Sequence, residues 1–187
     1  MLEITIPAAE NLWDPVSEIF ISSKETKLSL EHSLISLAKW ESKWHVPFLS
    51  SNKLSIPQLR DYVMCMTITQ NVDPLVYYVL TQDNLNDILS YIDNPMTATT
   101  INENALRAAN KGPRSNEIVT NELIYFWMTQ LNIPFDPCQK WHLNRLMTLI
   151  KVASIKSQPP KKMSRKEAMS QQKALNAARR ARMGSRG

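Results

Sequence analysis

The chain has 187 residues, 43% of them hydrophobic, and a net charge of +5. This length suits one ordinary domain with an appendage, and the apolar content is enough for a packed core. Three glycines in all provide almost no material for a phosphate-binding loop. No apolar run approaches the roughly 18 residues of a membrane span. The N-terminal stretch MLEITIPAAENLWDP carries Glu3 and Glu10 among its acids and neither Lys nor Arg, unlike a signal peptide, so we expect a cytoplasmic protein.

The charge is divided unevenly along the chain. Residues 1–150 carry 11 Lys or Arg against 16 Asp or Glu, whereas residues 151–187 carry 11 Lys or Arg and one acid, Glu167. An acidic body followed by a basic tail indicates a folded domain with a separate arm. Cys65 and Cys138 lie in apolar helical patterns, so we expect two reduced core thiols rather than a zinc site.

Three short segments near the N-terminus predict β-strands. Residues 2–7 alternate apolar and polar side chains, and residues 18–22 and 26–32 resemble two further strands joined by the polar turn SSKE. A sheet of this size is not stable alone. We therefore expect a small antiparallel β meander over residues 1–32 that packs on a helical body at residues 33–156.

The stretch LEHSLISLAKWESKWHVPFL (30–49) predicts an amphipathic helix over residues 34–44 with Ser33 as its N-cap. Its apolar stripe contains Leu34, Leu37, Ala38, Trp40 and Trp44. The opposite side, which we expect to face solvent, contains Lys39, Glu41 and Lys43. Both tryptophans are interpreted as structural, and we expect them to bury against the helices that hold Trp127 and Trp141, so that all four belong to the core.

Capping patterns predict the next three helices of the body. Ser55 and Pro57 begin a helix, Asp73 and Pro74 begin a short one over residues 73–80, and apolar periodicity predicts a third over residues 82–92. Helical spacing on the first of these places Leu59, Tyr62, Val63 and Met66 on its buried face.

The second half of the body opens with a long connection at residues 93–116, which could include a short helix at 103–110. Residues 116–131 are apolar on most sides and predict a central, largely buried helix. The segment FDPCQKWHLNRLMTLIKVA predicts one long helix, because Asp136 and Gln139 form a capping-box pair around a proline at its first position.

Residues 157–187 predict a Pro-Pro linker and a basic helical arm. The capping box SRKE (164–167) leads into an Ala-rich run that ends at Gly184, so we expect a helix from about residue 164 to 183. Its apolar face is thin, and such a helix is marginal alone. The candidate partner-binding residues of the arm are Lys161, Lys162, Arg165, Lys166, Met169, Lys173, Leu175, Arg179, Arg180 and Arg182.

No pattern in the sequence predicts a catalytic site or a metal-binding site. His32, His45 and His142 lack a further ligand at a diagnostic spacing and are interpreted as ordinary surface or packing residues. The hydroxyl clusters lack a positioned base, and the acids form no obvious catalytic pair. We therefore predict no catalytic residue, no cofactor site and no metal site. The arm's charge suits nucleic acid or an acidic protein surface, or it keeps the chain in solution.

Five segments resemble successive blocks of a family of small proteins encoded by tailed double-stranded DNA phages. They are LEHSLISLAKWESKWHVPFL, DYVMCMTITQNVDP, YIDNPMTATT, ELIYFWMTQLNIPFDPCQKWHLNRLMTLIKV and PPKKMSRKEAMSQQKALNAARRARMGSRG. The resemblance spans roughly residues 28–187. Members resemble products of the virion structural and assembly module, and many look like tail assembly chaperones. The resemblance implies binding to the tape-measure or tail-tube protein, without catalytic residues or cofactor.

We therefore expect an α+β, predominantly helical fold with a basic C-terminal arm, and a protein that is not an enzyme. The leading hypothesis is a phage tail assembly factor whose partners are tail proteins or neighbouring copies of itself. One alternative is a virion component of the neck, tail or baseplate, and another is a nucleic-acid-binding protein that uses the arm. The expected location is the host cytoplasm during assembly, or the virion under the structural alternative.

Overall fold

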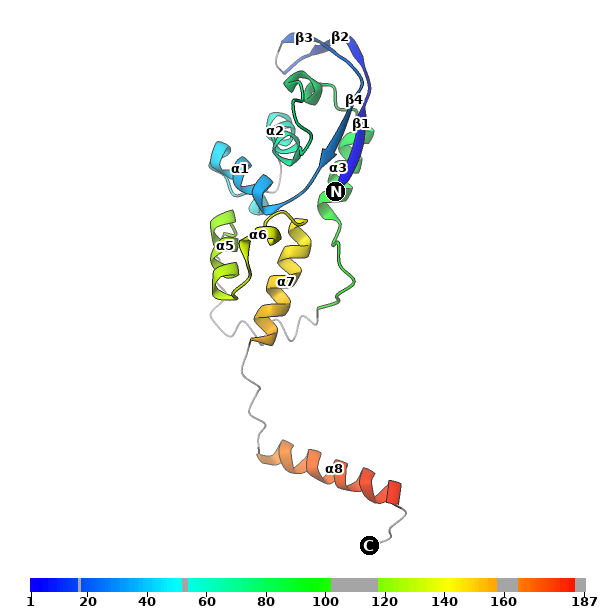
Figure 1. Cartoon of the computed structure of the whole chain (residues 1–187), viewed down its shortest axis with the longest axis vertical. Helices are drawn as coiled ribbons and strands as arrows, with labels where there is room; N and C mark the ends of the chain where they lie inside the picture. The colour runs from blue at the N-terminus through cyan, green and yellow to red at the C-terminus, as the bar shows by residue number, and fades with distance from the viewer. Residues whose placement is uncertain (17, 52–53, 102–117, 158–164, 184–187) are drawn as a thin grey trace. The chain divides into compact units, whose positions relative to one another are not determined.

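The computed structural model describes residues 1–16, 18–51, 54–101, 118–157 and 165–183. The chain divides into two compact units, Met1–Ser157, here called the body, and Gln158–Gly187, which contains the helix of the arm (Figure 1). The fold class is α+β and mostly helical, with a small antiparallel β region at the N-terminus, as predicted.

The β region is one long, interrupted hairpin. Its strands are β1 (Leu2–Ile6), β2 (Ala9–Asp14), β3 (Ile19–Ser23) and β4 (Thr26–Leu30). β1 pairs with β4 and β2 pairs with β3, so two antiparallel two-stranded sheets replace the predicted three-strand meander. The sequence prediction missed β2 because its register shifts between Ala9 and Leu12, which breaks the alternation of buried and exposed side chains.

Helices make up the rest of the described chain. They are α1 (Leu34–Trp44), α2 (Ile56–Met66), α3 (Gln82–Asp93), α5 (Asn121–Gln130), α6 (Phe135–Cys138), α7 (Leu143–Lys156) and α8 (Arg165–Met183), with 3-10 turns η1 (Phe48–Ser50) and η2 (Pro74–Tyr78). The predicted N-caps Ser33, Ser55 and Asp73 all accept backbone N–H bonds. These starts depend only on neighbouring residues, which is why sequence located them.

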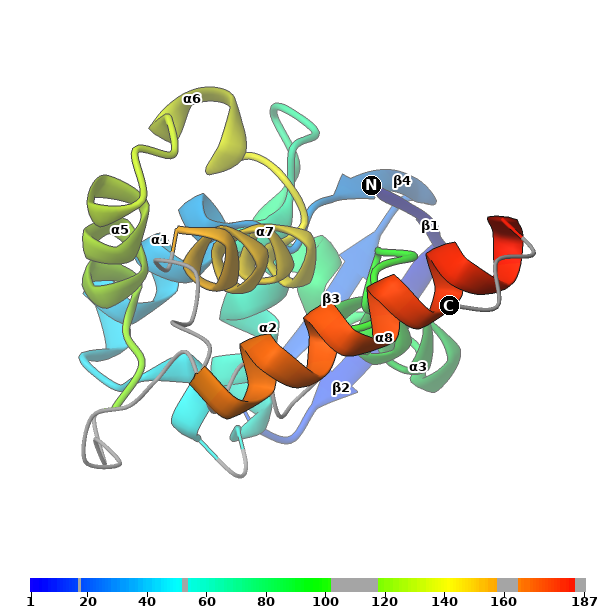
Figure 2. The ribbon, with the colours of Figure 1, turned by 90° about the horizontal axis from the view of Figure 1, so that it is seen from below.

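The hydrophobic core of the body consists of two clusters that meet at α1. The first cluster joins the hairpin to Trp40 of α1 and to α2, η2 and α3. The second joins Leu34 and Leu37 of α1 to α5, α6 and α7. Figures 1 and 2 show α5 beside α1, on the side away from the hairpin. Helix α1 therefore contributes apolar side chains to both clusters.

Two predictions for the second half of the body are wrong. The helix expected to start at Asp136 is two helices, α6 and α7, and α7 is capped by His142 instead. Asp136 forms an ion pair with Lys140 at 2.6 Å. Helix α5 is not largely buried: Asn121, Ile124 and Met128 are its buried residues, and Phe126 is 54% exposed. The short helix considered at residues 103–110 lies outside the described residues.

Candidate functional site

The two tryptophans of α1 pack against α2. Trp40 is fully buried, its Nε1–H donates to the Gln58 carbonyl oxygen at 2.9 Å, and its ring contacts Tyr62 edge-on. Trp44 is half-buried and donates its Nε1–H to Asp61 Oδ2 at 2.9 Å. Each indole thus combines apolar packing with a satisfied hydrogen bond, which is the arrangement that stabilises buried tryptophan.

The partners expected for these tryptophans are wrong. Trp127 and Trp141 are partly buried members of the second cluster, whereas Trp40 and Trp44 belong to the first. Trp141 instead stacks with the Arg145 guanidinium, 4.3 Å from the ring centroid. The sequence stripe of α1 gave no means of separating two partner surfaces, because both surfaces require apolar residues.

Glu41 is the residue of this segment that sequence reasoning misplaced. The side chain expected to face solvent is 7% exposed. Its Oε1 accepts the Phe48 backbone N–H at 2.8 Å, and its Oε2 accepts both the backbone N–H and the side-chain N–H of Asn121 at 2.8 Å. Charge-assisted bonds of this kind compensate the burial of a carboxylate. Glu41 therefore connects α1 to η1 and to the start of α5.

His32 and His142 form a buried pair between the two clusters. They are 1% and 6% exposed, and their ring centroids lie 5.1 Å apart. The Nε2–H of His142 donates to the Tyr91 carbonyl oxygen at 3.0 Å, and its Nδ1 accepts the Asn144 backbone N–H at 3.3 Å. These two partners fix the neutral tautomer of His142, since a protonated Nδ1 could not accept the capping bond.

Burial sets the protonation of this cluster. Desolvation, with a smaller contribution from His142, lowers the pKa of His32 to about 3. Desolvation also lowers the pKa of His142, and burial raises the pKa of Tyr62, whose hydroxyl shares a 2.5 Å hydrogen bond with His32 Nδ1. All three groups are therefore neutral at neutral pH. Their buried rings contact one another inside the body.

The remaining candidate groups of the described chain are metal-ligand side chains and free thiols. Among the residues that the structure describes, no group of three or more His, Cys, Asp or Glu could hold a metal ion. Cys138 is buried and Cys65 is half-buried, and both are free thiols. His45 is exposed at the C-terminal end of α1. Of the described helices, none is both long and apolar enough to cross a membrane.

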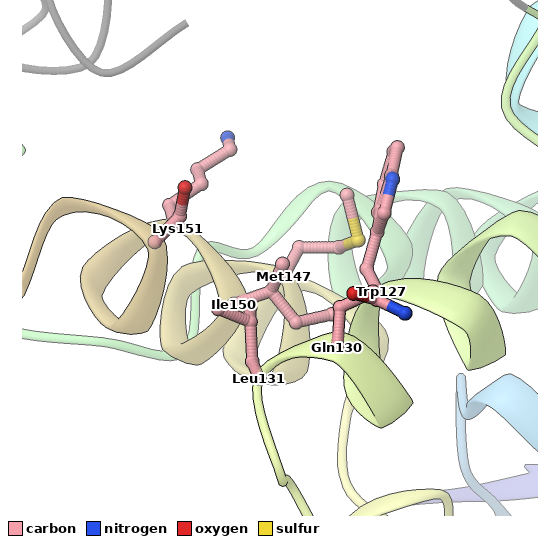
Figure 3. A pocket seen from close by; sticks show the side chains of 7 residues that line it. Trp127, Gln130, Leu131, Met147, Ile150 and Lys151 are labelled. Carbon is pink, nitrogen blue, oxygen red and sulfur yellow. The ribbon is translucent and has the colours of Figure 1, made fainter. Parts of the chain in front are cut away.

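A groove of about 400 Å³ lies between α5 and α7 (Figure 3). Figure 3 shows Trp127 and Met147 extending from the two helices on the same side, with Lys151 farther along α7. The lining consists of Trp127, Gln130, Leu131, Met147, Ile150, Lys151 and Ser154. The lining is mostly apolar, and its polar side chains are those of Gln130, Lys151 and Ser154.

The tip of the hairpin exposes a second apolar surface. Trp13 and Phe20 are directly opposite each other in the β2–β3 register, with ring centroids 5.0 Å apart, and are 49% and 70% exposed. Cross-strand partners lie on the same face, so the pair forms one aromatic surface. Leu12, Val16 and Ile19 of the same hairpin are also exposed, although the register places Leu12 and Ile19 on the opposite face from the aromatic pair. A cluster of this kind is typical of interaction sites.

The arm provides a third surface. In α8, Met169 is 56% exposed and Leu175 is 51% exposed, and the predicted bases Lys173, Arg179, Arg180 and Arg182 are also exposed. Arg165 and Lys166 belong to the helix, but their side chains are outside the described part of the chain, and Lys161 and Lys162 precede it. The structure thus describes a helix as predicted, with bases beside two large apolar side chains.

Helical spacing divides the described arm residues between two faces. Leu175, Arg179 and Arg182 follow the i, i+4, i+7 pattern, and Ala178 lies on the same side. We call these four residues the arginine face. Met169, Lys173 and Arg180 lie about 120–160° around the helix from Leu175, and we call these three residues the lysine face. Both faces combine apolar and cationic groups; the arginine face holds two apolar residues, Leu175 and Ala178, and the lysine face holds one, Met169.

No protein-family model matches the chain, and neither a curated protein nor a solved structure matches it significantly. Inferences about function therefore rest on the sequence and on the geometry described above.

Proposed function

We propose that the protein is a non-enzymatic assembly factor of a phage tail that binds another protein through α8. The observation that supports this role best is the chemistry of the arm, a separate helical unit whose described bases, Met169 and Leu175 are exposed. Exposed apolar side chains beside cations suit an acidic, partly apolar protein surface. The tail-assembly part of the proposal rests on the sequence resemblance to phage assembly proteins.

The polar groups buried in the body support a binding role over catalysis. Glu41 and the His32–His142 pair use their polar atoms for contacts within the body. These contacts hold the body together, while large apolar side chains of the hairpin tip and both apolar and cationic side chains of α8 remain exposed. Surfaces of this kind are suited to binding another protein rather than to catalysing a reaction.

The proposal is tested by co-expressing the full chain, or a variant without residues 158–187, with the tape-measure and tail-tube proteins of the same phage. We expect the full chain to co-purify with one of them and the truncated chain to lose it. Since exposed charges are screened within about 8 Å at physiological ionic strength, added salt should weaken the complex steeply. Equal co-purification of both forms would contradict a binding role for the arm.

Two further measurements separate the alternatives. A tail assembly chaperone is expected to be nearly absent from purified virions, so abundant peptides of this chain in virion mass spectra would favour a neck, tail or baseplate component. Duplex DNA is the other control. Binding to DNA as tight as binding to the tail protein, with a salt slope of several counterions, would favour the nucleic-acid alternative.

A further inference from the structure

We propose that the arginine face of α8 from one copy binds the exposed aromatic pair Trp13–Phe20 on the hairpin tip of a second copy. This inference rests on the proposed role of α8 as a binding segment and names one partner for it, another copy of the same chain. The contact is head-to-tail, since it joins two different surfaces of two identical molecules.

The chemistry of the hairpin tip selects a cationic and partly apolar occupant. Two large aromatic rings are exposed side by side, and the exposed carboxylates of Glu10 and Glu18 belong to the same hairpin. Residues 1–32 carry six acids and two lysines. An aromatic surface in an acidic setting attracts guanidinium groups through both the ring quadrupole and net charge.

The arginine face has the complementary chemistry. Arg179 and Arg182 are placed to stack on aromatic rings, which arginine does better than lysine. Leu175 and Ala178 are exposed on the same face and together provide a small apolar contact. The body itself contains two precedents for the pairing, with Arg60 over Tyr78 at 3.7 Å and Arg145 over Trp141 at 4.3 Å.

Pairing between two hairpin tips is disfavoured by charge. A symmetric contact through Trp13 and Phe20 would bring Glu10 and Glu18 of one copy close to the same carboxylates of the other, and like charges repel.

Within the body, the C-terminal end of α7 lies at the opposite end from the β2–β3 hairpin (Figure 1). The seven residues 158–164 that lead to α8 span at most about 25 Å, and Leu175 lies about 15 Å farther along the helix. We assign the arm of a neighbour as the occupant, and the complementation experiment below separates this contact from one within a single chain.

The test is a complementation experiment with full-length chains. One variant, Trp13→Ser with Phe20→Ser, loses the hairpin surface and keeps the arm. The other, Arg179→Glu with Arg182→Glu, loses the arginine face and keeps the hairpin. We expect the wild-type chain to form concentration-dependent oligomers in sedimentation velocity. Each variant alone should associate about tenfold or more weakly. A mixture of the two variants should restore association as a one-to-one complex.

A matched control is available on the same helix. Lys173→Glu with Arg180→Glu makes the same change in net charge on the lysine face, and we expect it to associate far better than the arginine-face variant. The serine substitutions are at exposed positions, and thermal melting followed by circular dichroism checks that the body stays folded. If the serine variant does not fold, Glu10→Lys with Glu18→Lys replaces it and should pair with the arginine-face variant.

Several outcomes would overturn the inference. They are a wild-type chain that stays monomeric at every concentration, a mixture of variants that fails to associate, and equal losses from the two pairs of arm substitutions. The proposed function fails separately. A monomeric chain that still binds a tail protein through its arm removes only the contact between copies, whereas a self-associating chain that binds no tail protein removes only the assembly role.

Discussion

At the scale of single residues, Glu41 shows how a charged side chain becomes part of a core. Its carboxylate accepts three N–H bonds from Phe48 and Asn121, and it is nearly excluded from solvent. The neighbouring Ser42 is exposed and bonds only within its own helix, to the Lys39 carbonyl oxygen. Two adjacent residues of α1 thus have opposite roles.

We predict that Glu41→Ala lowers the free energy of unfolding by about 3 kcal/mol or more. The change leaves buried N–H donors without an acceptor, and each costs about 1–3 kcal/mol. Urea unfolding measures the loss. The control, Ser42→Ala, should stay within about 0.5 kcal/mol of the wild type. Similar stabilities for the two variants would show that the Glu41 contacts are not important for the body.

At the scale of elements, short-range and long-range contacts act on different helices. Helix α2 begins at a capping box between Ser55 and Gln58, which depends on residues three apart. Helix α7 begins instead where the Leu143 backbone N–H donates to the His32 carbonyl oxygen at 2.7 Å. That bond joins residues far apart in sequence, and the local pair Asp136–Gln139 does not form the predicted cap.

Helix α8 is an element that we expect the body not to need for stability. All described members of the two apolar clusters come from residues 1–157. We predict that deleting residues 158–187 leaves the melting temperature of the body within a few degrees of the full chain, measured by circular dichroism at a concentration too low for self-association. A large drop would mean that the arm contributes to the core.

At the scale of the whole molecule, the His32–His142 pair links the two apolar clusters. His32 contacts Tyr62 of the first cluster, and His142 caps α7, which forms part of the second. The neighbouring polar groups are Tyr91, Glu31 and the terminal ammonium of Met1, joined by hydrogen bonds and an ion pair. The protonation of either ring therefore affects how both clusters hold together.

We predict that acid destabilises the body through this pair. The folded-state pKa of His32 is about 3, below the usual 6.5. Between pH 3 and pH 6.5 the unfolded chain therefore binds more protons than the folded chain. Stability is therefore complete above about pH 6.5 and falls toward pH 3, with a slope of about 1.4 kcal/mol per pH unit for each histidine that stays neutral. Urea unfolding at a series of pH values measures this slope.

Two variants identify the source of the slope. His32→Gln should be less stable at neutral pH but should lose less stability on acidification, because it removes one suppressed protonation. Ser42→Ala, at an exposed position without a titratable group, should keep the wild-type slope. An unchanged slope in the first variant would assign the acid sensitivity to other groups.

The sequence by itself determined features that depend on neighbouring residues. Ser33 and Ser55 were recognised as caps, the fold class followed from the two periodicities, and the segregation of charge predicted a basic helix apart from the body. Hydrogen bonds between residues three apart and the spacing of apolar side chains are local, so they can be read from a linear pattern.

Only the tertiary structure decided which surfaces meet. Glu41 finds its partner Asn121 80 residues away, and Trp40 packs on α2 rather than beside Trp127. The exposed pair Trp13–Phe20 depends on a strand register that the sequence did not reveal. In each case the deciding free energy comes from desolvation and contacts between distant segments, and apolar or charged residues do not specify in a linear pattern which distant segment they will contact.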